Sequence, residues 1–218
     1  MKIRIAHVAT LVVAAACGAS CALLLSDSAM SKERRFPQLT LERLTDEQRP
    51  LAEQIMKISS VGIAGPYNVL LRSPVMARRM YDLLDYLRWH SSVPTRLNEF
   101  AILIQARLWR SQVEWFAHHP LALEAGLSPD VAADLKANRR PRGMQPDEEA
   151  VYDFCMELST RHEVSDEVFG RLRRFFSEQQ VADLVVLSGT YVTVAMVLSA
   201  GEEGVPAGKE LPFKPDEP

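Results

Sequence analysis

Glu114 and His118, near the middle of the chain, place a carboxylate and an imidazole four positions apart. On a helix this spacing puts both side chains on one face, separated by one turn. A carboxylate beside an imidazole can act as a proton-transfer pair, form half of a metal site, or make an ordinary solvated contact. The pair therefore raises the question of acid/base chemistry.

Glu99 is a further carboxylate of interest, because it interrupts the otherwise apolar sequence RLNEFAILI. It either faces solvent, where Arg96 could pair with it, or is buried with a partner. Glu114 also has a structural alternative, since Ser111 stands three positions before it and Ser-x-x-Glu is a capping box. The positive end of the helix dipole would favour an ionised Glu114. Such a carboxylate could orient His118 and increase its basicity.

The resulting hypothesis is that Glu99, Glu114 and His118 converge on one apolar pocket. In this hypothesis His118 carries the proton, Glu114 orients it, and Glu99 is the second acid/base group. The chain has no His-Glu-x-x-His motif, no Cys/His cluster and no phosphate-binding glycine loop. We therefore expect neither a metal ion nor an organic cofactor.

The elements that must position these residues are predicted to be helices. Their starts combine a capping residue or a proline with apolar residues at helical spacing. The predicted starts lie at Thr45–Gln48, Ser73–Pro74, Pro94–Thr95, Ser111, Ser128–Asp130, Asp147, Ser165 and Ser177–Gln180. The segment VVLSGTYVTVAM is rich in β-branched residues, but its length and the preceding capping box favour a helix. The sequence therefore predicts an all-α, single-domain helical bundle.

Burial and loops can also be predicted from the pattern. The helix that begins at Thr95 and the one spanning 181–200 are apolar on most sides, so other helices or another subunit should cover them. The segment 62–74 is expected to be irregular, and 138–147 to be a basic, solvated linker. The residues from Gly201 onward are expected to be disordered or to lie across a neighbouring subunit.

The first thirty residues have a different composition. A basic start, Lys2 and Arg4, precedes an uncharged run over residues 8–25. This order is typical of a secretory signal peptide, predicted to be cleaved near residues 26–31, and an uncleaved membrane anchor is the alternative. Cleavage would remove Cys17 and Cys21 and leave Cys155, which is expected to be a buried, inert thiol.

The composition of the whole chain is that of an ordinary globular protein. Its 218 residues carry a net charge of −3, with acidic and basic residues interleaved along the sequence. The length suits one domain plus a targeting segment. Nothing in this charge distribution indicates a nucleic acid as partner.

The sequence RLNEFAILIQARLWRSQVEWFAHHPLALEAGLS resembles the core of the carboxymuconolactone decarboxylase superfamily, which includes the alkylhydroperoxidase D-type peroxidases. The resemblance covers residues 36–206 and leaves 207–218 as a tail. It implies an all-helical fold and a homo-oligomer, a trimer or a multiple of one. The peroxidase branch has Cys-x-x-Cys-x-x-x-His at a helix start and a glutamate on the preceding helix. That glutamate corresponds to Glu99 and the histidine to His118, while Ser111 and Glu114 occupy the cysteine positions.

The missing dithiol decides between the two branches of the superfamily. Dithiol peroxidase chemistry requires a thiolate and a resolving thiol, which serine and glutamate cannot supply. The resemblance therefore implies a decarboxylase-like, cofactor-free acid/base enzyme acting on a small organic acid or lactone. The helix start at Ser111 could receive a substrate carboxylate. With the signal peptide, the expected location is periplasmic or secreted. The alternatives are a peroxidase and a non-catalytic oligomeric binding protein.

Overall fold

The computed structural model describes residues 33–59 and 61–214, which belong to one compact unit. The elements in chain order are a 3-10 helix Leu41–Arg43, α1 Arg49–Ile58, α2 Pro66–Leu70, α3 Pro74–Asp85, a π-helix Tyr86–His90, α4 Thr95–Leu108, α5 Gln112–Glu124, α6 Pro129–Lys136, α7 Pro146–Thr160, α8 Asp166–Leu172 and α9 Glu178–Gly201. No strand occurs in these two ranges, and the prediction of an all-α fold is confirmed. The predicted signal segment 1–30 lies outside the described residues.

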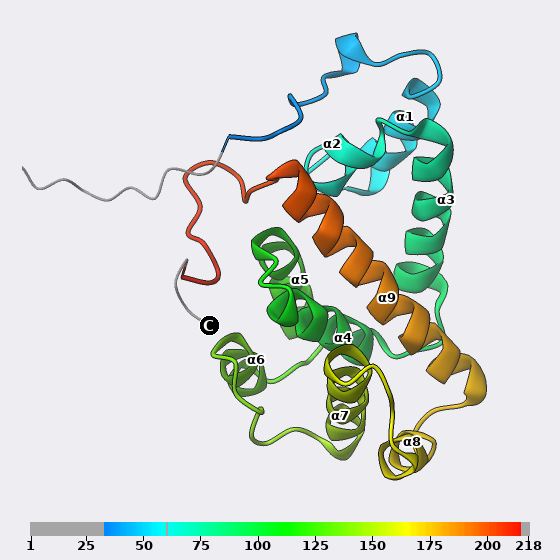
Figure 1. Ribbon diagram of the computed structural model, residues 1–218, viewed down its shortest axis with the longest axis vertical. Helices are drawn as coiled ribbons and strands as arrows, with labels where there is room; N and C mark the ends of the chain where they lie inside the picture. Colours follow the sequence, from blue (N-terminus) through cyan, green and yellow to red (C-terminus); the bar gives the residue numbers. More distant parts are fainter. Residues whose placement is uncertain (1–32, 60, 215–218) are drawn as a thin grey trace, which may run out of the picture. The chain divides into compact units, whose positions relative to one another are not determined.

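Helix α4 is the centre of the fold. Every residue from Leu97 to Arg107 is buried, including Phe100 and Ile104, which have no exposed surface. Helices α5, α7 and α9 pack around it (Figure 1). A helix that is apolar on most of its circumference needs such neighbours, because each side would otherwise expose hydrophobic surface to water. The predicted burial of this segment is confirmed.

Three of the predicted helix starts are confirmed by capping hydrogen bonds. Ser177 and Gln180 form both bonds of a capping box at the start of α9, and the hydroxyls of Ser128 and Ser165 accept backbone N–H groups of α6 and α8. The start predicted at Asp147 is wrong. Helix α7 begins at Pro146, because Gln145 forms the capping box with Glu148.

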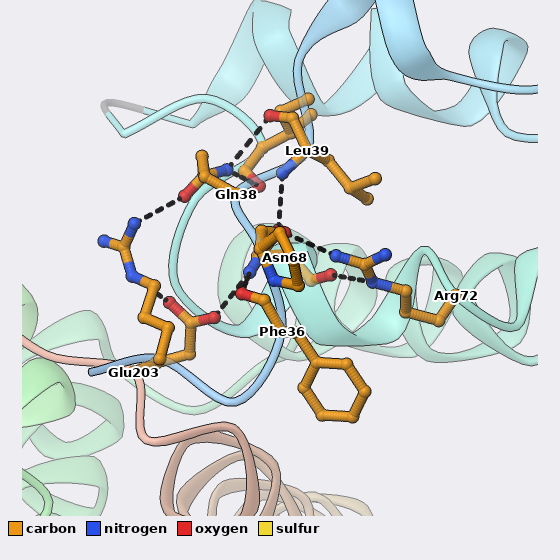
Figure 2. Close-up of polar contacts among 9 residues, drawn as sticks. Phe36, Gln38, Leu39, Asn68, Arg72 and Glu203 are labelled. Carbon is orange, nitrogen blue, oxygen red and sulfur yellow. Dashed lines mark hydrogen bonds and ion pairs between the residues drawn. The ribbon is translucent and has the colours of Figure 1, made fainter. Parts of the chain in front are cut away.

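The segment 62–74 is more regular than its glycines and prolines suggest. Gly65 has a positive φ of 59°, which only glycine adopts easily, and Pro66 then begins α2. Asn68 of α2 is fully buried, and its side chain connects three segments (Figure 2). Its amide oxygen accepts the Leu39 N–H at 2.8 Å, and its amide nitrogen donates to Glu203 Oε1 at 2.6 Å. The predicted irregular loop is therefore partly helical and internally anchored.

The 138–147 linker is not simply solvated. Arg139 and Arg142 form ion pairs with Asp134, and Arg140 forms one with Asp153. The positive charges of this connection are therefore neutralised by acidic residues of α6 and α7.

The C-terminal segment up to Lys214 packs against its own chain, contrary to the expectation of disorder. Phe213 is 2% exposed, and its ring lies 5.1 Å from that of Trp115 in an edge-to-face arrangement. The Gln112 side chain bonds both the N–H and the carbonyl of Phe213, at 2.9 Å each. Aromatic burial and paired backbone groups hold this segment on α5.

Helix α9 is apolar and long, and it packs on both α2 and α4 (Figure 1). By length and composition it could cross a bilayer, but half of its most apolar window is buried inside the fold. Asp183 of α9 accepts hydrogen bonds from Tyr86 and Ser91. The partial burial and the polar contacts of Asp183 are those of a core helix with one exposed side.

Candidate functional site

The connection between α4 and α5 fixes the geometry of the candidate site. Arg110 has a positive φ of 51°, its N–H donates to the Arg107 carbonyl, and the Ser111 N–H donates to the Ala106 carbonyl at 2.8 Å. These two bonds around a left-handed residue form a Schellman motif, which ends α4 and turns the chain sharply. Helix α5 then begins at Gln112 and packs along α4.

The predicted capping box between Ser111 and Glu114 is wrong. Its backbone donor, the Ser111 N–H, is already bonded to Ala106 at the end of α4. The Ser111 hydroxyl and both carboxyl oxygens of Glu114 are buried, and none has a hydrogen-bond partner among the described residues. Glu114 is thus a buried carboxyl group that no capping interaction explains.

His118 and Glu99 form a buried pair across the α4–α5 interface. His118 Nδ1 lies 2.7 Å from Glu99 Oε2, and the residues are 7% and 4% exposed. The alternative partner of Glu99, Arg96, instead pairs with Asp147 and Glu148. The structure therefore brings together two of the predicted site residues, and Glu99, rather than Glu114, orients the imidazole.

The pairing also determines which ring nitrogen can exchange a proton. A carboxylate only accepts hydrogen bonds, so with Glu99 ionised His118 carries its proton on Nδ1. The lone pair then lies on Nε2, to which the described part of the chain gives no hydrogen-bond partner. This arrangement leaves Nε2 as the atom for proton transfer.

Glu114 remains in the same helix as His118, one turn before it, and both side chains are buried. Burial raises the pKa of Glu114 to about 8. The neighbouring Ser111 hydroxyl, although it does not meet hydrogen-bond geometry, opposes this shift only in part. The expectation of an ionised Glu114 is therefore wrong, because loss of solvation outweighs the helix dipole. At neutral pH this carboxyl group is mostly protonated and can donate a proton.

Tyr191 of α9 extends the site and was not predicted. Its ring meets that of His118 edge-on, with centroids 5.0 Å apart and planes at 90°. Burial raises the pKa of its hydroxyl, the Arg88 charge opposes this rise, and the Glu99 charge adds to it. Tyr191 could have been noticed in the sequence as a polar aromatic residue within an otherwise apolar helix.

Arg88 was also missed by sequence reasoning. It lies in the π-helix that follows α3, and such distortions are frequent at functional sites. Its Nε is buried without a hydrogen-bond partner in the described residues, and its guanidinium lies 4.7 Å from the Trp89 ring centroid. Tyr67 of α2 completes the surroundings: burial raises the pKa of its hydroxyl, and the Arg88 charge opposes this. No pattern in the sequence marked the π-helix.

Other possible centres lie away from this cluster. In the described ranges no group of three or more His, Cys, Asp and Glu side chains could hold a metal ion. Two surface hollows, of about 320 and 450 Å³, are lined by residues of α1 and α3 and of α7 and α8, respectively. Neither includes the Glu99–His118 pair.

The structure is similar to two solved structures of the alkylhydroperoxidase D type. One is described as an alkylhydroperoxidase AhpD core, an uncharacterized peroxidase-related protein from Ralstonia eutropha JMP134. It has a TM-score of 0.65 and 18% identity, covering 76% of this chain and 88% of that one. The other, an uncharacterized peroxidase-related protein from Silicibacter sp. TM1040, has a TM-score of 0.65 and 17% identity, covering 82% and 96%.

This likeness establishes the fold. The chain has the all-α architecture of the alkylhydroperoxidase D core, consistent with the superfamily resemblance found in the sequence. No family model and no curated protein sequence matches the chain. The chemistry must therefore be argued from the side chains themselves.

Proposed function

We propose that this protein is a cofactor-free acid/base enzyme of the carboxymuconolactone decarboxylase type, acting on a small organic acid or lactone. The observation that carries the proposal is the buried Glu99–His118 pair, 2.7 Å apart, one helix turn from the buried, unpartnered carboxyl group of Glu114. Buried polar groups without partners are rare in folded proteins and are expected where a ligand supplies the missing contacts.

The geometry supports different roles from those expected from the sequence alone. Glu99 holds Nδ1 of His118 and so fixes the orientation of the ring. His118 Nε2 accepts a proton as the general base. Glu114, with a pKa of about 8 caused by burial, is the matching general acid. A base and an acid held in different environments can act on the same substrate at neutral pH.

This pair suits a reaction in which a proton moves to or from carbon. When a substrate carboxylate leaves as carbon dioxide, the bonding electron pair stays on the adjacent carbon. Glu114 or protonated His118 then supplies the proton that forms the new C–H bond, and solvent returns it to the protein. Closely packed helices around the cluster would limit competing proton exchange with water.

The peroxidase alternative receives no support from the site. Ser111 and Glu114 stand where a dithiol would be needed. Cys155 is fully buried on α7, burial raises the pKa of its thiol to about 12, and its sulfur lies 3.7 Å from the Ser188 hydroxyl. A thiol in this state forms very little thiolate at neutral pH, and only the thiolate is reactive.

Export is a second part of the proposal. The basic start and the uncharged run over residues 8–25 support secretion or periplasmic location. Retention of this segment as a membrane anchor is the alternative. Amino-terminal sequencing of the protein recovered from its native cell fraction separates the two, because an anchored chain keeps residue 1.

The decisive test is whether His118 exchanges protons with a bound substrate. We would follow the His118 ring signals by NMR while titrating pH, with and without levulinate, crotonate and γ-butyrolactone, and measure deuterium incorporation into each compound. If the protein is an enzyme, it should catalyse deuterium incorporation into at least one compound, and this incorporation should be lost without the His118 imidazole. A shift of the His118 signals without exchange would indicate a non-catalytic binding protein, and no response to any of the compounds would contradict the proposal.

A further inference from the structure

Arg88 carries a buried donor that the described residues leave without an acceptor. We propose that Arg88 binds a carboxylate of the ligand, one that anchors the molecule rather than reacts, and thereby makes the site selective for organic acids. This inference rests on the proposed function, because it assumes that the Glu99–His118 pair and Arg88 face the same ligand.

The position of Arg88 is fixed by contacts on both sides of the π-helix. The Asn98 side chain donates to the Leu87 carbonyl at 2.8 Å, which ties the turn to α4 beside Glu99. The Tyr86 hydroxyl donates to Asp183, which ties it to α9 two turns before Tyr191. The two helices that hold the π-helix therefore also carry site residues.

The charge of Arg88 acts in the interior of the site. Burial raises the pKa of the Tyr191 hydroxyl, and the Arg88 charge opposes this rise. Tyr191 in turn contacts the His118 ring. Tyr191 therefore connects the Arg88 charge with the acid/base pair.

Neither nearby carboxyl group neutralises Arg88. No ion pair involving Arg88 is present in the described part of the chain, whereas Arg96 and Arg140, for example, each have one. Glu99 is used by His118, and Glu114 is mostly protonated at neutral pH because it is buried. A cation with a buried, unpaired N–H is suited to an incoming anion.

The contact with Trp89 does not satisfy the guanidinium. The Trp89 ring covers the flat face of the guanidinium group, whose central carbon lies 4.7 Å from the ring centroid. The N–H groups lie in the guanidinium plane and stay available for hydrogen bonds. A planar carboxylate can accept two of these N–H groups at once. The Arg88 charge influences the hydroxyls of both Tyr67 and Tyr191, so these two rings are the candidates for contacting the rest of a small ligand.

The test follows the Arg88 Nε–H signal in 15N-labelled full-length protein. Arg88→Lys identifies the signal by its loss, and the exposed Arg79 on α3 serves as the internal control. Acetate and levulinate are added at constant ionic strength, and methyl levulinate provides a neutral molecule of nearly the same shape. We expect both carboxylates to shift the Arg88 signal saturably, with no effect of the ester and none on Arg79.

Binding is then compared between variants. Arg88→Gln should weaken levulinate binding by about 30-fold, as expected when one partner of a buried charged contact is removed, and Arg88→Lys should restore part of it. Equal responses of Arg88 and Arg79, or equal binding of the acid and its ester, would overturn the assignment even if the enzyme is active. Carboxylate binding at Arg88 without proton exchange at His118 would instead overturn the proposed function.

Discussion

His118 Nδ1 lies 2.7 Å from Oε2 of Glu99, a residue 19 positions earlier in the chain and on the facing helix. Glu114, only four positions away on the same helix, makes no such contact. Side chains one turn apart on a helix run side by side, whereas a side chain of the facing helix can point directly at the imidazole. Packing of α4 on α5 therefore selects the partner of His118.

The first prediction concerns this pair. His118→Ala should reduce the turnover rate by about 10²- to 10⁴-fold, as losing a general acid/base group usually does. Glu99→Gln should reduce it less, because the imidazole stays in place but loses its charged partner. Steady-state rates of the two variants and the wild type, measured at the same pH, would show the change.

The control for this experiment is the neighbouring histidine. His119 stacks on Trp115 with ring centroids 5.7 Å apart and is outside the Glu99–His118 pair, so His119→Ala should keep the wild-type rate. His118→Ala also leaves the buried Glu99 unpartnered, which should cost about 1–3 kcal/mol of stability. The rates are therefore compared below the melting temperature of the least stable variant. Equal rates for His118→Ala and wild type would contradict the catalytic role.

The second prediction is a pH dependence of stability caused by Glu114. Burial raises its pKa from the ordinary 4.5 to about 8, so between these values the folded protein binds more protons at this site than the unfolded chain. Its contribution to the free energy of unfolding is complete below pH 4.5 and falls by about 1.4 kcal/mol per pH unit as pH rises toward 8. Urea unfolding of wild type and Glu114→Gln at pH 6, 7 and 8 measures the difference.

Glu114→Gln should lose this slope and become more stable than wild type at the highest pH, since the amide cannot ionise. Glu124, on the same helix but exposed, gives the matched control: Glu124→Gln should follow the wild-type curve. If wild type and Glu114→Gln have parallel stability curves from pH 6 to 8, Glu114 is not protonated in the folded protein.

The features that could be predicted from the sequence are those with a local cause. The capping box of Ser177 and Gln180 is formed by residues three positions apart, and it marks the start of α9 correctly. The burial of α4 follows from its apolar circumference. Glu99 and His118 could be singled out because each is a polar residue in an apolar helical setting.

The failures have a tertiary cause. Ser111 and Glu114 match a capping box, but the Ser111 N–H is taken by the end of α4, which only the α4–α5 turn reveals. The ionisation of Glu114 depends on how much protein covers it. The turn that carries Arg88 is held by hydrogen bonds of its other residues to Asn98 and Asp183. Contacts between residues so far apart in the chain leave no recognisable pattern in the sequence.

The third prediction is that Cys155 takes no part in redox chemistry. Its thiol is buried, and burial raises its pKa to about 12, so it should react neither with peroxide nor with a thiol reagent in the folded protein. Cys155→Ser should leave the protein's activity and its peroxide consumption unchanged. Peroxide consumption that is sustained by a dithiol reductant and disappears in Cys155→Ser would restore the peroxidase interpretation.

The last prediction concerns assembly. Val185, Val186 and Met196 of α9 are 42–49% exposed on a helix whose other side is in the core. Solvent exposure of several large apolar side chains on one helix is costly, and a second copy of the chain could cover them. Together with the superfamily resemblance, this leads us to expect a homo-oligomer, a trimer or a multiple of one. Sedimentation velocity at micromolar concentration measures the state.

Val186→Asp should shift the population to monomer, because an interface would have to bury the new charge without a partner. Val75→Asp is the matched control, since Val75 is 68% exposed and belongs to α3 rather than α9, so this variant should assemble like wild type. Dissociation by both variants would show a general effect of added charge rather than an interface on α9. A wild-type protein that sediments as a single monomeric species would remove the case for assembly, and the exposed side of α9 would then have to be stable in water by itself.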